Sequence, residues 1–401
     1  MDLSRKPRLQ HLDMLRGLCA LGVVISHLRA LLVVPYAEAA RHGLFDKLLF
    51  ALGGLGHECV IAFFALSGFL VGGSTLAAMR AGRFSWADYG VARLSRLWTV
   101  LVPALALTAL WDALGALLGP AGAYQGALAA ILESGPTARE PATHSLVTLL
   151  GNLLFLQTIE TPVFGSNRPL WSLANEAWYY LVFPLLAFAF FHRAPIMRAF
   201  CAAAGALALA LLPGELALLG LPWLAGALAA DNPARPSLAR ALAGALATLA
   251  ALGVSHMSRT VLGDIALGCA IAFWLRDLAA FPSIGGLYGA AAHGVSEISY
   301  TLYAVHFPLL LMLWFWLLAP ARSQPGFAVL GQMAILMGIA LIYATAVWFL
   351  FERRTDVVRG WLLRRLRASR GGVAARRRRD KPERIVSRAW NGTPLSDARR
   401  L

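Results

Sequence analysis

Arg16 and His27 stand out chemically because both lie in one apolar segment, LDMLRGLCALGVVISHLRA. Ionisable side chains inside a membrane span are costly and usually functional. Eleven helical residues give about 16 Å of rise and about 20° of rotation, so the two side chains share one face. We predict that Arg16 holds an anion near one mouth and that His27 serves a chemical step deeper in the membrane. The alternative is an arginine reaching the interface and a histidine bonded to a neighbouring helix.

Glu58 and Ser67 belong to a second apolar segment, GHECVIAFFALSGFLVGG. Glu58 enters at a depth that should match that of His27, and we predict that it orients this histidine. Ser67 and Gly68 lie about 13–15 Å further in, near Arg16, where they suit a narrow ligand channel. A packing contact between small residues is the alternative for this step.

Glu176 lies about five residues inside a helix that begins WSLANEAWYYLVFPLL. The tryptophan and tyrosines of this segment are typical of a membrane interface. These interface residues predict that Glu176 lies at the depth of His27, where a carboxylate and an imidazole can exchange a proton. An ion pair that only holds helices together is the alternative.

Two further motifs carry candidate ligand-binding residues. In RLSRLW, Arg93 and Arg96 are three residues apart on one helical face and suit a phosphate, which arginine binds with two hydrogen bonds. Cytoplasmic positive charge alone is the alternative. In ISYTLYAVHFPLL, Tyr300 and His306 are expected in the inner half of a span. His306 is either part of a ligand tunnel or a structural donor.

These residues are positioned by a chain too apolar for a soluble protein. Of 401 residues, 58% are hydrophobic and 14% charged, against roughly 45–50% and about 25% in soluble domains. We predict an all-α polytopic membrane protein with about ten transmembrane helices. The expected spans are 12–34, 49–72, 97–118, 171–191, 196–213, 215–230, 238–254, 260–276, 298–318 and 327–351. The segment 146–157 is too short and is expected to be re-entrant or interfacial.

The basic residues predict how the chain is oriented in the membrane and divide it into a membrane domain and a tail. Lys and Arg gather on one side if the spans alternate, so both termini are expected in the cytoplasm. Residues 1–352 form the expected membrane domain. Residues 353–401 form an arginine-rich tail, expected to be largely disordered, that acts as a topogenic signal or contacts membrane lipid. Nucleic acid is not an expected partner, because a basic tail on a membrane body is explained by the charge rule.

Four isolated cysteines, without paired Cys or His spacing, support neither a disulfide framework nor a zinc site. We therefore expect no metal.

Five motifs together resemble the acyltransferase 3 family of bacterial membrane acyltransferases, over about residues 8–352. LDMLRGLCALGVVISH is similar to the family's LDGLRGxA followed by an Arg-x10-His spacing, with Met14 where a Gly is usual. The other four are FFALSGFL, RLSRLW, PLWSLANEAWYYLVFP and ISYTLYAVHFPLL, in the family's order.

This resemblance implies an inner-membrane O-acyltransferase that takes an acyl group, commonly acetyl, from cytosolic acyl-CoA. The acceptor is typically a sugar hydroxyl of a cell-surface or exported glycan, free or lipid-linked. Acyl-CoA is a co-substrate, and no tightly bound cofactor is implied. The family ties activity to the residues that match Arg16 and His27, and the arginines that match Arg93 and Arg96 also count.

Combined with the spacing arguments, this gives a hypothesis for the mechanism. Arg16, Arg93 and Arg96 hold the CoA phosphates, and His27 is the general base on the acceptor hydroxyl, oriented by Glu176 or Glu58. A transient acyl-histidine is the variant. The main alternative is a secondary transporter with Arg16, His27 and Glu176 as a proton relay, although the inverted repeats of many transporters are not found. A non-catalytic scaffold would need no buried arginine or histidine.

Overall fold

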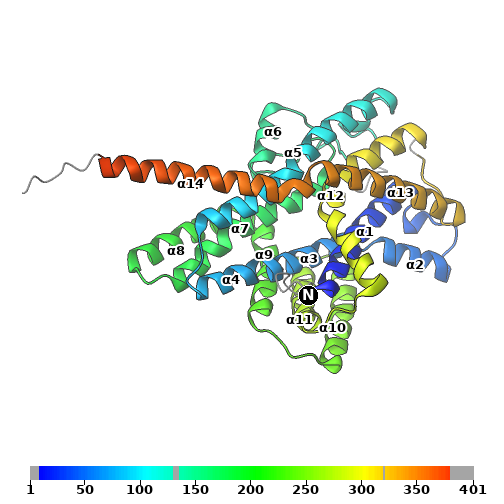
Figure 1. Ribbon diagram of the computed structural model, residues 1–401. Helices are drawn as coiled ribbons and strands as arrows, with labels where there is room; N and C mark the ends of the chain where they lie inside the picture. The colour runs from blue at the N-terminus through cyan, green and yellow to red at the C-terminus, as the bar shows by residue number, and fades with distance from the viewer. Residues whose placement is uncertain (1–8, 130–134, 319–320, 380–401) are drawn as a thin grey trace, which may run out of the picture.

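The described part of the chain, residues 9–129, 135–318 and 321–379 of the computed structural model, consists of helices and connections without a β-strand (Figure 1). The longer helices are α1 (Gln10–Leu32), α2 (Leu44–Gly53), α3 (Gly56–Ser67), α4 (Gly73–Arg80), α5 (Trp86–Leu118), α6 (Leu146–Leu153), α7 (Trp171–Phe191), α8 (Pro195–Ala210), α9 (Gly214–Asp231), α10 (Leu238–Ser258), α11 (Val261–Ala279), α12 (Gly286–Leu317), α13 (Phe327–Leu350) and α14 (Thr355–Arg379). Short helices are η1 (Tyr36–Glu38), η2 (Gly68–Gly72), η3 (Ala123–Gln125), η4 (Arg168–Leu170) and η5 (Glu352–Arg354). The predicted all-α class is confirmed.

Each of the ten expected spans falls on helical structure, although the count of ten itself stays a prediction. Among the described residues, seven helical stretches are both long and apolar enough to cross a membrane. They are Gln10–Leu32, Leu44–Arg80, Trp86–Leu118, Arg168–Phe191, Leu238–Ser258, Gly286–Leu317 and Phe327–Ala368. The segment expected to be re-entrant or interfacial contains the eight-residue α6, which is far shorter than the ~20 residues a span requires.

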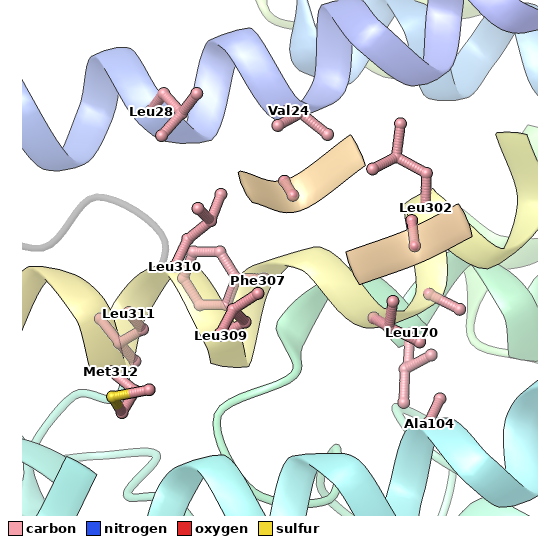
Figure 2. Close-up of a cluster of buried hydrophobic side chains, with 14 of the residues drawn as sticks. Val24, Leu28, Ala104, Leu170, Leu302, Phe307, Leu309, Leu310, Leu311 and Met312 are labelled. Carbon is pink, nitrogen blue, oxygen red and sulfur yellow. The ribbon is translucent and has the colours of Figure 1, made fainter. Parts of the chain in front are cut away.

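Helix α12 is the centre of the larger apolar core. Every residue from Leu302 to Phe315 is buried, as expected for a helix that is hydrophobic on all sides. Val24 and Leu28 of α1 lie opposite Phe307 and Leu310 of α12, as Figure 2 shows. The α1–α12 contact therefore fixes how the histidine-bearing turn of α1 meets its neighbour.

A second core joins α3 and η2 to α9, and two glycines permit the close approach. A Cβ atom on Gly68 would lie 1.8 Å from the Trp223 carbonyl oxygen, and one on Gly226 would lie 2.1 Å from the Ala65 carbonyl oxygen. Only glycine fits at such backbone contacts. This packing places the fully buried Trp223 indole beside Ser67.

Two prolines inside helices free backbone carbonyls that then tie helices together. Proline lacks an N–H group, so the carbonyl four residues earlier loses its helical partner. Pro308 frees the Ala304 carbonyl, which accepts a 2.9 Å hydrogen bond from Nδ2 of Asn167. Pro184 likewise frees the Tyr180 carbonyl, which accepts a 2.8 Å bond from the Tyr89 hydroxyl.

The basic tail begins as a helix, which differs from the expectation of a largely disordered segment. α14 covers Thr355–Arg379 and projects away from the helical body (Figure 1). Its first turn is tied to α5 by a 2.9 Å hydrogen bond between the hydroxyls of Thr355 and Thr99. Residues 380–401 lie outside the described part, so that share of the prediction remains untested.

Candidate functional site

A cavity opens at the junction of α1, α3, η2, α5, α7 and α12. Its volume is about 130 Å³. Arg16, Ser67, Arg96, Glu176 and Tyr300 all line it, so the structure brings together five of the predicted site residues. The rest of the lining is Phe63, Phe64, Leu66, Leu70, Val71, Leu97, Ser172, Leu173, Tyr180, Ser299 and Tyr303.

Arg16 and Arg96 are the two arginines in the lining of the cavity. Nη2 of Arg16 donates a 3.3 Å hydrogen bond to the Ser296 carbonyl and lies 3.3 Å from Asp13. Nη1 of Arg96 lies 3.3 Å from the carboxylate of the buried Glu352. Both guanidinium groups are thus held by acceptors of the protein while remaining part of the cavity lining.

Arg93 lies one helical turn before Arg96 on α5 and does not line the cavity. Both arginines are on the 33-residue helix α5, which agrees with the helical spacing used for them in the sequence analysis. Arg93 stacks its guanidinium over the rings of Tyr89 and Tyr180, at 5.8 and 5.7 Å from their centroids. Among the described residues it has no carboxylate within ion-pair distance. Arg93 therefore contributes a positive charge that no acidic side chain of this region matches.

Ser67 and Glu176 form the polar wall of the cavity. The Ser67 hydroxyl donates a 2.5 Å hydrogen bond to Oε1 of Glu176 and accepts one of 3.1 Å from Nε1 of Trp223. The Tyr180 hydroxyl also donates to Oε1 of Glu176, at 2.5 Å. These donors fix the Glu176 carboxylate facing the cavity that also holds both arginines.

The prediction that Glu176 lies with His27 finds no support in these contacts, none of which involves His27. It rested on interpreting the aromatic residues of α7 as an interface belt, yet these side chains bond within the protein. Nε1 of Trp178 donates to the Phe155 carbonyl at 2.9 Å, and the buried Tyr179 hydroxyl donates to the Leu216 carbonyl at 2.6 Å. These aromatic residues therefore do not indicate how deep in the membrane Glu176 lies.

His27 lies at the interface of α1 with α12, next to His306. The centroids of the two imidazole rings are 5.2 Å apart, and that of His27 is 4.8 Å from the Phe307 ring. His306 was expected nearer the inner side than His27, and the structure instead places both at one level. Neither histidine lines the cavity directly.

Glu58 is paired with another histidine and not with His27. Its Oε1 lies 2.7 Å from Nδ1 of His256 on α10, and the adjacent His57 contacts Asp264 on α11 at 2.8 Å. Glu58 is buried and its Oε2 has no hydrogen-bond partner among the described residues. The expectation that Glu58 orients His27 does not agree with this geometry.

Tyr303 connects the cavity with the histidine pair. It lines the cavity, its hydroxyl donates a 2.8 Å bond to the Pro169 carbonyl, and that hydroxyl lies 2.6 Å from the Ser172 hydroxyl. Its ring centroid is 6.4 Å from that of His306. Ring contacts therefore link a residue of the cavity lining, Tyr303, to His306 and through it to His27.

Several residues that hold the site were missed by the sequence analysis. Glu352 pairs with Arg96 and accepts a 2.5 Å bond from Thr301, although it begins η5, 256 positions after Arg96 in the chain. Its position directly after the last apolar run was a signal that could have identified it. Trp223 carries no such signal, because its role follows only from how α9 packs on α3.

On α5, Asp112 lies sixteen residues beyond Arg96, a rise of about 24 Å that places it toward the other end of the helix. Its buried carboxylate lies 2.8 Å from Nε2 of His144 and accepts hydrogen bonds from the backbone N–H and the hydroxyl of Ser166, at 2.8 and 2.5 Å. This cluster ties the connections 119–145 and 154–167 to α5. Among the described residues no group of three histidine, cysteine or acidic side chains could hold a metal ion.

The sequence model of a protein family described as an acyltransferase domain matches residues 9–353. No curated protein and no solved structure matches the chain. The matched residues include the cavity, the histidine pair and all five motifs.

Proposed function

Since the chain belongs to the acyltransferase 3 family and is a membrane acyltransferase, we propose that it transfers an acyl group from cytosolic acyl-CoA to a hydroxyl group. The favoured acyl group is acetyl. The acceptor is a cell-surface or exported glycan, or its lipid-linked precursor, and the proposed location is the inner membrane. Acyl-CoA serves as co-substrate rather than as a resident cofactor.

The observation that carries this proposal is a cavity lined by Arg16, Arg96 and Glu176, one of whose lining residues, Tyr303, contacts the His306–His27 pair. Coenzyme A carries several phosphates, and guanidinium groups bind phosphate with paired, charge-assisted hydrogen bonds. Arg16 and Arg96 line the cavity, and Arg93 lies one turn away. An acyl chain that enters past Ser67 is directed toward Tyr303 and the histidines beyond it.

In the proposed reaction, neutral His27 is the general base. It takes the proton of the acceptor hydroxyl while the oxygen attacks the thioester carbonyl. A carbon–oxygen bond forms, the carbon–sulfur bond breaks, and the proton passes from His27 to the departing thiolate. In the covalent variant His27 itself receives the acyl group before the acceptor does. The charge that develops at the carbonyl oxygen needs a donor, and the Ser172 hydroxyl, which lines the cavity, is the candidate for this role.

Glu176 remains a candidate catalytic residue with a different task from the expected one. Its carboxylate faces the cavity alongside Arg16 and Arg96 rather than the imidazole of His27. We assign it to the acyl-CoA side of the reaction, where it balances the arginine charge and orders Ser67 and Tyr180. Glu58 is paired with His256 and, among the described residues, contacts neither Arg16, Arg96 nor His27.

The transporter alternative required a relay that passes through Arg16, His27 and Glu176. The contacts of Glu176 and His27 are with different partners, which offers that relay no direct step. An assay in membrane vesicles that carry the protein distinguishes the two functions. The vesicles are treated with a protonophore and given radiolabelled acetyl-CoA. An acyltransferase transfers label to envelope glycan without a gradient. Gradient-dependent solute uptake with no transfer of label would contradict the proposal.

A further inference from the structure

The hydrogen bonds of His306 define which of its nitrogens carries the proton. Nδ1 lies 2.9 Å from the carbonyl oxygen of Leu302 and 3.0 Å from that of Tyr303. A carbonyl oxygen only accepts, so Nδ1 must be the N–H donor. In the neutral ring Nε2 then carries a bare lone pair. A doubly protonated ring at this fully buried position would leave a charge and an N–H donor unpaired, which is more costly.

Nε2 of His306 is a buried acceptor that lacks a hydrogen-bond donor among the described residues. Such atoms are uncommon in folded proteins, and each calls for a physical explanation. The polar ring next to it is that of His27, which also has no hydrogen-bond partner in the described part of the chain. A buried acceptor without a donor and an imidazole that can supply an N–H therefore lie side by side.

The separation of the two rings suits a bond between them. Two imidazoles joined end to end by an N–H···N hydrogen bond have centroids about 5 Å apart, an ordinary bond length plus two ring radii. The observed separation is 5.2 Å, with the ring planes tilted by 41°. The two carbonyl contacts hold the His306 ring, whereas the outer torsion of a histidine side chain is broad, so the His27 ring can rotate toward Nε2 of His306 without moving the helices.

We propose that His306 is the positioning residue of His27. Its Nε2 accepts the N–H of His27, which fixes the tautomer of His27 and directs the lone pair of the other His27 nitrogen toward the substrate. The role assigned from the sequence to Glu58 or Glu176 thus belongs to a neutral imidazole on α12. After His27 takes up a proton, the same bond stabilises the imidazolium, because the acceptor carries a lone pair and no proton of its own.

This inference rests on the proposed function for its catalytic meaning, but the hydrogen bond itself is testable without turnover. Nitrogen-15 spectra of histidine-labelled protein in lipid nanodiscs report which ring nitrogens are protonated. We expect His306 to be protonated at Nδ1, and a through-bond or through-space correlation to join its Nε2 to an N–H of His27. A His27→Gln sample assigns the His27 signals. Absence of that correlation, with both rings assigned, overturns the inference whatever the enzyme does.

Two substitutions separate positioning from packing. In His306→Gln the side-chain oxygen replaces the Nε2 acceptor, whereas in His306→Asn the amide reaches only the Nδ1 position. We expect His306→Asn to lower kcat about 100-fold with KM for acyl-CoA unchanged, and His306→Gln to recover most of that loss. If folded His306→Asn and His306→Gln have equal kcat, and the His27 nitrogen signals match those of the wild type, then His306 has a structural role only. A wild type that shows the correlation but transfers no acyl group would refute the proposed function alone.

Discussion

The Ser67 hydroxyl donates a 2.5 Å hydrogen bond to the Glu176 carboxylate, across 109 positions of sequence. This contact joins two of the five motifs, the SGF step and the NEAW segment, in the wall of one cavity. The carboxylate thus shares a cavity with Arg16 and Arg96, whereas the ring next to His27 is that of His306.

Glu176→Gln is expected to lower kcat by roughly 10–100-fold with the fold intact. The amide oxygen can still accept from Ser67 and Tyr180, so the change removes the charge more than the hydrogen bonds. Turnover and thermal unfolding are measured together. Glu140→Gln is the matched control, since Glu140 is exposed and paired with Arg168 at the surface. Full activity in Glu176→Gln would mean that its charge is not used.

Arg93→Ala is expected to weaken acyl-CoA binding about tenfold while leaving stability nearly unchanged. Stability should change little because Arg93 contacts two aromatic rings but no carboxylate in the described residues, so its loss leaves no acidic side chain unpaired. Binding is measured by calorimetry with CoA and with 3′-dephospho-CoA. Arg83→Ala, an exposed arginine in the connection before α5, serves as control. Identical affinities in both variants would remove Arg93 from the site.

Arg96→Met is expected to destabilise the protein because it leaves the Glu352 carboxylate buried without its cation. The double variant Arg96→Met/Glu352→Gln should recover about 1–2 kcal/mol, a reduced figure because the Arg96 side chain is 43% exposed. Unfolding of the two single variants and the double variant in detergent gives the coupling free energy. If the losses of unfolding free energy in the two single variants add up exactly in the double variant, the pairing of Arg96 with Glu352 is contradicted.

Gly68→Ala is expected to destabilise the protein by about 1–3 kcal/mol, because the added methyl group meets the Trp223 backbone. The displaced indole would also lose its bond to Ser67. Gly90→Ala on α5 is the control, as nothing lies within 4 Å of its added Cβ, and it should be neutral or slightly stabilising. Similar unfolding temperatures for both variants would argue against the close α3–α9 packing.

The sequence predicted what lies along each helix better than which helices touch. Hydropathy placed each of the ten expected spans on helical structure but did not predict α4 or α14. Helical rise predicted Ser67 near Arg16, and both line one cavity, because such arguments need only one segment at a time. Partners across helices depend on rotation and packing. The sequence therefore paired His27 with a carboxylate, whereas ring contacts bring His306 to it and hydrogen bonds hold Glu58 to His256. Glu352 was missed for the same reason. The catalytic and binding roles themselves remain predictions.

The most direct measurement of the central claim is transfer of radiolabel from acetyl-CoA to envelope glycan by purified protein in nanodiscs. Wild type, His27→Gln and His293→Gln are compared, the last being an exposed histidine of α12. We predict labelling by wild type and His293→Gln, and a loss of at least about 100-fold in a folded His27→Gln. Equal labelling by all three proteins would contradict the account, because acyl transfer would then proceed without His27.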